Sequence, residues 1–150
     1  MVRKPNKTAN DYAKLAAIVE IASRSGKKPV RADDVASAIG NSDSHVEVMC
    51  AQLRKRGLIK SFVGPSGGYV LARPPSRIFI ADVVDFVKTG GIGKRYSVSD
   101  AKADENAQYL WEQSEHLLLY VFRHISLADI LHGDLKANPF LKRVREFCRA

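Results

Sequence analysis

Residues 41–73, NSDSHVEVMCAQLRKRGLIKSFVGPSGGYVLAR, decide the fold because a helical periodicity is followed there by a strand periodicity. Ser44 and Glu47 form an S-x-x-E pair, which predicts a capping box at the start of the helix. The helix then has apolar residues at the three- and four-residue spacing of one face, and these are Val46, Met49, Cys50 and Leu53. We therefore expect one amphipathic helix in the first half of this stretch.

Two short β-type runs, LIKSFV at 58–63 and YVLA at 69–72, flank the turn GPSGG at 64–68. Such runs around a glycine-rich turn predict a β-hairpin whose glycines adopt positive φ. The turn lacks the lysine and the following helix that a phosphate-binding P-loop requires. Residues 64–68 are therefore expected to form a hairpin tip.

Two further helical patterns precede this stretch. NDYAKLAAIVEIASRSGKK, residues 10–28, predicts a helix with Asn10 as its N-cap, and RADDVASAIG, residues 31–40, predicts a shorter one that ends at Gly40. Two helices joined by a short turn, with a third packed behind them, form a helix-turn-helix. Three helices followed by a hairpin predict a winged helix-turn-helix, with 64–68 as the tip of the wing.

The second half of the chain predicts more helix. SRIFIADVVDFVKTGG suggests a helix over about 81–88, and its inward residues are Val83, Val84 and Val87. Residues 89–104 have neither helical nor strand period, and a loop of that length in a small protein is functional or disordered. After it, Ser126 caps LADIL, and Asn138 followed by Pro139 opens a last helix. The sequence therefore divides into a winged helix-turn-helix domain, a fold typical of DNA-binding proteins, at 1–77 and a helical dimerisation or regulatory region at 78–150.

The long helix expected at 105–125 has more apolar surface than one small domain can cover. Such a surplus favours pairing with a second copy of the chain over packing against its own winged domain. The residues expected at this homodimer interface are Leu110, Trp111, Leu117, Leu118, Val121, Phe122 and Ile125.

Charge is distributed unevenly along the 150 residues, whose net charge is +8. Residues 1–75 contain 13 Lys and Arg against 6 Asp and Glu, whereas residues 76–150 contain 11 against 10. A basic first half suits contact with a polyanion such as nucleic acid, although a merely solvated basic surface gives the same count. No apolar run reaches the roughly 18 residues of a membrane span, and the first residues lack a secretory h-region, so a cytoplasmic location is expected. No nucleophile elbow, Walker loop or H-E-x-x-H motif points to an enzyme.

These residues resemble the Rrf-two family of bacterial winged-helix transcription regulators. The resemblance spans most of residues 10–132 and is most specific in LRKRGLIKS and GPSGGYVLAR. It implies a homodimer that binds double-stranded DNA at an inverted-repeat operator, with repression as the expected mode of action. It also implies that the third helix lies in the major groove and the wing in the adjacent minor groove.

Two departures from the family pattern matter. Members that hold an iron–sulfur cluster have three closely spaced cysteines in the loop before the long helix, whereas residues 89–104 contain none. Cysteine thiolates are the usual ligands of such clusters, so no cofactor is expected. Before the Gly-Pro turn of the wing, this chain has Val63 where the family pattern suggests an arginine. The wing is therefore expected to make backbone contacts rather than to select a sequence.

The resemblance and the helix geometry select the candidate DNA contacts. The solvent-facing residues at the start of the third helix are Ser42, Ser44, His45, Glu47 and Val48, and the base-contacting candidates among them are Ser42, Ser44, His45 and Glu47. The phosphate and wing candidates are Lys28, Arg31, Arg54, Lys55, Lys60, Ser66 and Gly67. Capping explains Ser44 and Glu47 equally well, packing is the stronger interpretation of His45, and solvation or helix-dipole effects explain the cations.

The first hypothesis is therefore a dimeric DNA-binding repressor without a cluster. A winged-helix module that binds proteins and has lost its operator is the alternative. The signal stays open between oxidation of Cys50, a small effector, and a protein partner at the 89–104 loop. A reactive thiol needs exposure and a lowered pKa, which a Cys50 buried beside Val46 and Met49 would lack.

Overall fold

A computed structural model of the protein describes residues 7–24, 26, 28–85 and 99–150. Its elements in chain order are α1 (Lys7–Arg24), α2 (Ala32–Ile39), α3 (Asp43–Lys55), β1 (Ile59–Phe62), β2 (Gly68–Leu71), the 3-10 turn η1 (Pro75–Arg77), α4 (Ile80–Val83), α5 (Ala101–Arg123), α6 (Leu127–His132) and α7 (Pro139–Arg149). The expected class, mainly helical with one small hairpin, is confirmed.

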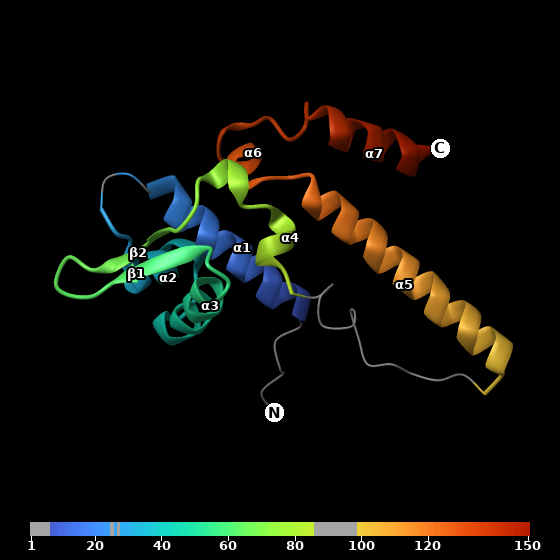
Figure 1. Ribbon diagram of the computed structural model, residues 1–150, viewed down its shortest axis with the longest axis horizontal. Helices are drawn as coiled ribbons and strands as arrows, with labels where there is room; N and C mark the ends of the chain where they lie inside the picture. Colours follow the sequence, from blue (N-terminus) through green and yellow to red (C-terminus); the bar gives the residue numbers. More distant parts are fainter. Residues whose placement is uncertain (1–6, 25, 27, 86–98) are drawn as a thin grey trace.

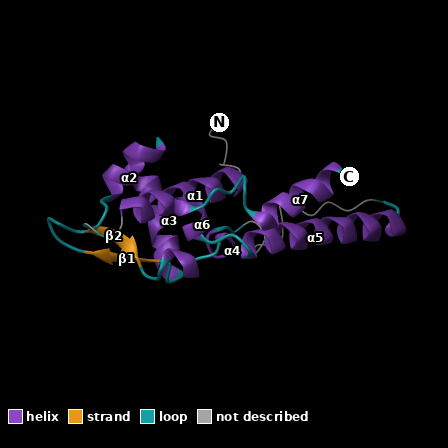
Figure 2. Cartoon of the chain, turned by 90° about the horizontal axis from the view of Figure 1, so that it is seen from above, coloured by secondary structure: helices purple, strands orange, loops and turns teal. Residues whose placement is uncertain are grey.

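The first three helices and the hairpin form a compact unit, and α5 extends away from it (Figure 1). Seen from above, α5 and α7 lie at one end of the molecule and the hairpin lies at the opposite end (Figure 2). No helix within the described residues combines enough length with enough apolar character for a membrane crossing.

The main core joins the inner faces of α1, α2 and α3 to the hairpin. Its fully buried side chains include Ile18 and Ile21 of α1 and Met49 and Leu53 of α3. Burying each such side chain contributes about 1.5–3 kcal/mol before the entropic cost of ordering it. Ile78, Val83 and Leu127 belong to the same cluster. The division at residue 77 stays a prediction, because apolar packing continues across it.

A second, smaller core joins α4, α5, α6 and α7. Ile80, Val84 and Ile125 are its buried members. The backbone N–H of Ile80 donates to the carbonyl of Ile125 (3.0 Å), and the N–H of Leu127 donates to the carbonyl of Ile78 (2.7 Å). These two backbone hydrogen bonds hold the segment that follows α5 against the segment where α4 begins.

The wing is tied to the helices by the backbone as well as by packing. β1 and β2 are antiparallel, with Ile59 opposite Leu71 and Phe62 opposite Gly68. Val30, just before α2, donates to the carbonyl of Tyr69 (2.9 Å) and accepts from its N–H (2.8 Å). Gly64 (φ 114°) and Gly68 (φ 150°) have the positive φ predicted for the turn, whereas Gly67 does not.

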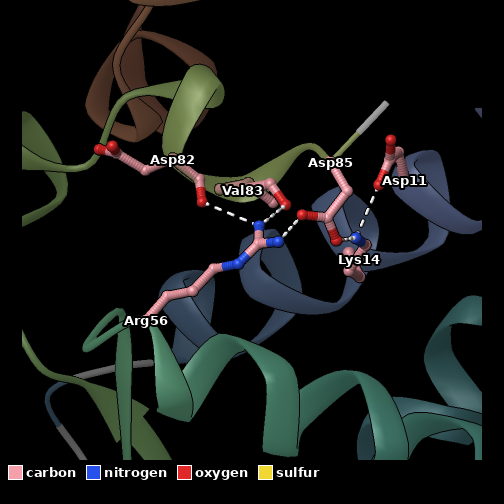
Figure 3. Close-up of polar contacts among 6 residues, drawn as sticks. All are labelled: Asp11, Lys14, Arg56, Asp82, Val83 and Asp85. Atoms are coloured by element: carbon pink, nitrogen blue, oxygen red, sulfur yellow. Dashed lines mark hydrogen bonds and ion pairs between the residues drawn. The ribbon is translucent and has the colours of Figure 1, made fainter. Parts of the chain in front are cut away.

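A buried charge network joins α1, α3 and the end of α4 (Figure 3). Lys14 is fully buried in α1, where it pairs with Asp11 at 2.6 Å and with Asp85. Asp85 also pairs with Arg56, the residue that caps the C-terminal end of α3. The Arg56 guanidinium donates to the carbonyls of Asp82 (3.2 Å) and Val83 (2.8 Å), where the carbonyl end of α4 favours a cation.

Several predicted boundaries in the first half of the chain are wrong by a few residues. The first helix begins at Lys7, so Asn10 is inside it rather than its cap. The third helix begins at Asp43, with Ser42 as its N-cap, so the predicted Ser44–Glu47 capping box does not form. The second helix ends as predicted, because Gly40 adopts the left-handed conformation.

In the second half, the expected helix at 81–88 is the single turn α4, and Val84 is already extended. Val83 and Val84 are buried as predicted, and Val87 lies outside the described residues. The expected 89–104 loop is shorter than predicted, because Asp100 caps α5 and residues 101–104 form its first turn. The caps expected at Ser126 and Asn138 are both present.

Two wing glycines leave no room for a side chain. At Gly67 a Cβ would lie 2.3 Å from the carbonyl oxygen of Phe62, and the other position is Gly68, which also has a positive φ. A Cβ at Gly68 would lie 2.5 Å from the carbonyl oxygen of Val30, whereas a Cβ at Gly64 meets nothing within 4 Å. We expect Gly68→Ala to lower the free energy of unfolding by about 2–4 kcal/mol and Gly64→Ala by about 1 kcal/mol. Urea denaturation of both variants tests this. Equal losses would mean that backbone strain alone, rather than contact with Val30, makes glycine necessary.

Candidate nucleic-acid interface

The start of α3 is held by the residues immediately before it. The Ser42 hydroxyl accepts from the N–H of His45 at 3.4 Å, and Asn41 Oδ1 accepts from the N–H of Ser42 at 2.9 Å. The same Asn41 oxygen lies 3.0 Å from His45 Nδ1. Asn41 thus organises the turn, a role that the sequence interpretation did not assign to it. An asparagine one residue before a serine cap was the available signal.

Of the four base-contacting candidates, three are exposed and one is half-buried. Ser42, Ser44 and Glu47 are exposed at the N-terminal end of α3, whereas His45 is half-buried against Asn41. The Ser44 hydroxyl lies 3.5 Å from that of Ser42. Because Ser44 is not the cap, its hydroxyl is not committed to the helix end. Ser44 and Glu47 therefore present polar groups outward, and His45 has the packing role.

Four of the phosphate and wing candidates line one cleft. A hollow of about 760 Å³ lies between the end of α1, the chain before α2 and the wing tip, and Lys28, Arg31, Ser66 and Gly67 are among its lining residues. The Arg31 guanidinium pairs with Asp33 (3.1 Å), a residue that lines the neighbouring hollow between the wing and the starts of α2 and α3 rather than this cleft. This hydrogen bond lowers the pKa of Asp33, and the same carboxylate raises the pKa of Arg31.

The other cations lie in the last turn of α3 and on β1. Arg54 donates to the Ser61 hydroxyl of β1 at 3.0 Å, which links the helix to the wing. Lys55 and Lys60 are exposed on the helix and on β1. All three are accessible, and Arg54 also has a structural partner.

The wing presents an apolar rather than a basic edge. Val63 is fully exposed (101%), and Phe62 beside it is exposed as well. A second hollow of about 370 Å³ lies between the wing and the starts of α2 and α3, and its charged lining residues are Arg31, Asp33, Asp43 and Glu47. This side of the wing therefore has more acidic than basic groups.

Cys50 lies inside the main core among the buried residues of α3. Burial raises the pKa of its thiol to about 11, with a smaller contribution from Glu47. A thiol with so high a pKa is a poor nucleophile at neutral pH, and the core also shields it. Both observations oppose the redox hypothesis for Cys50. Cys148 is exposed on α7.

The donor set of the chain does not fit a cysteine-ligated iron–sulfur cluster. The sequence has two cysteines, and their places in α3 and α7 do not form a ligand group. Within the described residues, no group of three or more His, Cys, Asp or Glu side chains is arranged to hold a metal ion.

Three packed helices followed by a two-stranded wing define a winged helix-turn-helix protein. The model of the Rrf2 (Rrf-two) family, described as an iron-dependent transcriptional regulator, matches residues 7–133, so the chain belongs to this family. The resemblance inferred from sequence is thus confirmed.

Named relatives and solved structures agree with this assignment. The HTH-type transcriptional regulator IscR of Cereibacter sphaeroides is 31% identical over 141 residues, which cover 88% of this chain and 90% of that protein. IscR of Klebsiella pneumoniae is 36% identical, covering 80% of this chain and 76% of that protein. Among structures, T. potens IscR matches with a TM-score of 0.66 at 29% identity, covering 86% of this chain and 88% of that one. CymR, the global cysteine regulator of B. subtilis, matches with a TM-score of 0.66 at 25% identity, covering 89% and 99%.

The N-cap of α3 is Ser42 and not Ser44, so we expect the two serines to differ in their contribution to stability. We expect Ser42→Ala to lower the free energy of unfolding by about 1 kcal/mol, because the helix loses its N-cap acceptor. Ser44→Ala should leave stability within about 0.5 kcal/mol of the wild type, because its hydroxyl does not cap the helix. Urea denaturation of the two single variants measures both effects. A larger loss of unfolding free energy for Ser44→Ala than for Ser42→Ala would contradict the Ser42 cap and support the Ser44–Glu47 capping box instead.

Proposed function

We propose that this protein is a DNA-binding transcription regulator that acts in the cytoplasm as a homodimer on an inverted-repeat operator. We expect it to repress, and to do so without an iron–sulfur cluster. Its family membership and its named relatives support transcription regulation. The homodimer, the operator and repression are our inference from the residues described above.

One observation carries the proposal: the N-terminal part of α3 presents an exposed face with Ser44 and Glu47 beside an exposed wing. A helix contacts base edges in the major groove through such N-terminal residues. A serine hydroxyl pairs with several base edges, and a glutamate accepts from a cytosine amino group. Lys28 and Arg31 in the cleft beside the wing tip, with Lys55 and Lys60, provide cations for the flanking phosphates.

The homodimer is supported by the surface of α5. None of the described side chains of this 23-residue helix is buried, and Leu110 (68% exposed) and Leu117 (61% exposed) lie two turns apart on one face. Trp111 is exposed on the neighbouring face, whereas Leu118, Val121 and Phe122 are half-buried. Ile125 must be removed from the interface, because α5 ends before it and the protomer's own second core leaves it only 5% exposed.

We expect no iron–sulfur cluster because of the number and the positions of the cysteines. Thiolate ligation of iron needs several cysteines near one another, and this chain has one in the main core and one on α7. Protein purified without oxygen should therefore be colourless and contain no stoichiometric sulfide.

The DNA prediction is tested by selecting genomic fragments on the protein at about 50 mM and about 200 mM salt. We expect one inverted repeat to be bound about 10³-fold more tightly than random DNA at the higher salt. Glu47→Gln should lower affinity for this repeat selectively. Lys55→Gln should weaken binding to every sequence and reduce the salt slope by about one.

Lys102→Gln, at the far end of α5 where Lys102 pairs with Glu105, is the matched control and should change neither quantity. Loss of all binding at the higher salt, for every fragment, would contradict the proposal and favour a protein-binding module. Transcription in vitro from a promoter that contains the repeat should fall when the protein is added.

The dimer prediction concerns the apolar face of α5. Leu117→Asp should convert the dimer to a monomer, because a charge would have to be buried at the interface. His116→Asp adds the same group at the neighbouring exposed position on another face and should leave the dimer intact. Sedimentation equilibrium gives the mass of each. A Leu117→Asp variant that stays dimeric would exclude this face, and a monomeric wild type would exclude the homodimer.

A further inference from the structure

The outward face of α3 has an apolar centre that the site described so far does not use. Val48 is 55% exposed and belongs to neither apolar core of the described residues. Residues 44, 48, 51 and 55 are spaced by three and four, so Ser44, Val48, Ala51 and Lys55 form one stripe along the helix. All four are exposed, and the stripe lies opposite the buried face with Val46, Met49, Cys50 and Leu53. Val48 therefore stands between a polar residue and a cation on the side directed away from the protein.

The chemistry of Val48 restricts what it can contact. Its side chain neither donates nor accepts a hydrogen bond, so it cannot pair with the amino, carbonyl or ring-nitrogen groups of the bases. The floor of the major groove has one apolar group, the C5-methyl of thymine, which apolar side chains contact in known complexes. A β-branched residue is also a weaker helix former than alanine, so local helix stability does not explain its presence there.

We propose that Val48 contacts the C5-methyl group of a thymine in each half-site and thereby contributes to operator specificity. This inference rests on the proposed function. Glu47, the preceding residue, is exposed beside Val48 and accepts hydrogen bonds. The face thus pairs an acceptor for a cytosine amino group with an apolar group for a thymine methyl. The cations that attract DNA, Lys55 and Lys60, lie farther along the chain and leave Val48 unobstructed.

The experiment removes the methyl group from the DNA and the side chain from the protein separately. In the inverted repeat selected on the wild-type protein, each thymine is replaced in turn by deoxyuridine, which lacks only the C5-methyl. Fluorescence anisotropy at fixed salt then gives the Kd for the wild type, Val48→Ala, Val48→Thr and Val63→Ala. Val63 is the matched control, because it is an exposed valine on the wing, and the minor groove has no C5-methyl.

We expect one thymine position in each half-site to weaken wild-type binding about fourfold when replaced, and about fifteenfold when both half-sites are replaced. Val48→Ala should bind the thymine operator more weakly than the wild type does, by a similar factor. Replacing the thymine at that position with deoxyuridine should not weaken the binding of this variant further. Val48→Thr, which keeps one methyl group, should retain a response there, and Val63→Ala should keep the full wild-type response.

Two results overturn the inference while leaving the proposed function intact. One is a selected operator at which no thymine responds to deoxyuridine. The other is a Val48→Ala variant that keeps the wild-type response at every thymine. Failure to select any operator would overturn the proposed function, and the thymine contact with it.

Discussion

The buried ammonium group of Lys14 is the constraint on which the arrangement of the helices depends. A lysine without a countercharge is very costly inside a protein, so its surroundings have to supply carboxylates. Asp11 supplies one from the preceding turn of the same helix, and Asp85 supplies another from beyond α4. Because Asp85 also pairs with Arg56 at the end of α3, the requirement of one buried charge fixes three helices relative to one another. Removing either carboxylate would leave the buried ammonium group of Lys14 with less compensation for its charge.

The apolar cores add to this arrangement but do not set its details. Ile78, Val83 and Leu127 join the main core from the second half of the chain, and Ile80, Val84 and Ile125 form the smaller one. Apolar contacts tolerate small sliding movements, whereas a guanidinium that donates to two carbonyls at the end of α4 does not. Arg56 therefore holds the end of α3 to the end of α4.

The winged fold followed from sequence because periodicity and turn chemistry are local signals. The left-handed Gly40 and the hairpin around residues 64–68 could be predicted from a few neighbouring residues. The cap of α3 could not, since Ser42 and Ser44 are both suitable serines and only the hydrogen bonds of Asn41 favour the earlier one. Ile125 continued the apolar spacing of α5, but the helix ends before it. Asp85, the second partner of Lys14, lies 71 residues away, and no local pattern indicates such a distance.

In the proposed complex, the hydrogen bonds between Val30 and Tyr69 would have a consequence for the DNA as well as for the protein. They join the wing to the start of α2, and α2 packs against α3, so α3 and the wing are held at a fixed separation. A duplex bound by both must adopt the groove width and curvature that this separation demands. The energy of that deformation depends on the base steps between the two contacts. Base pairs that no side chain touches would then contribute to the choice of operator through their stiffness alone.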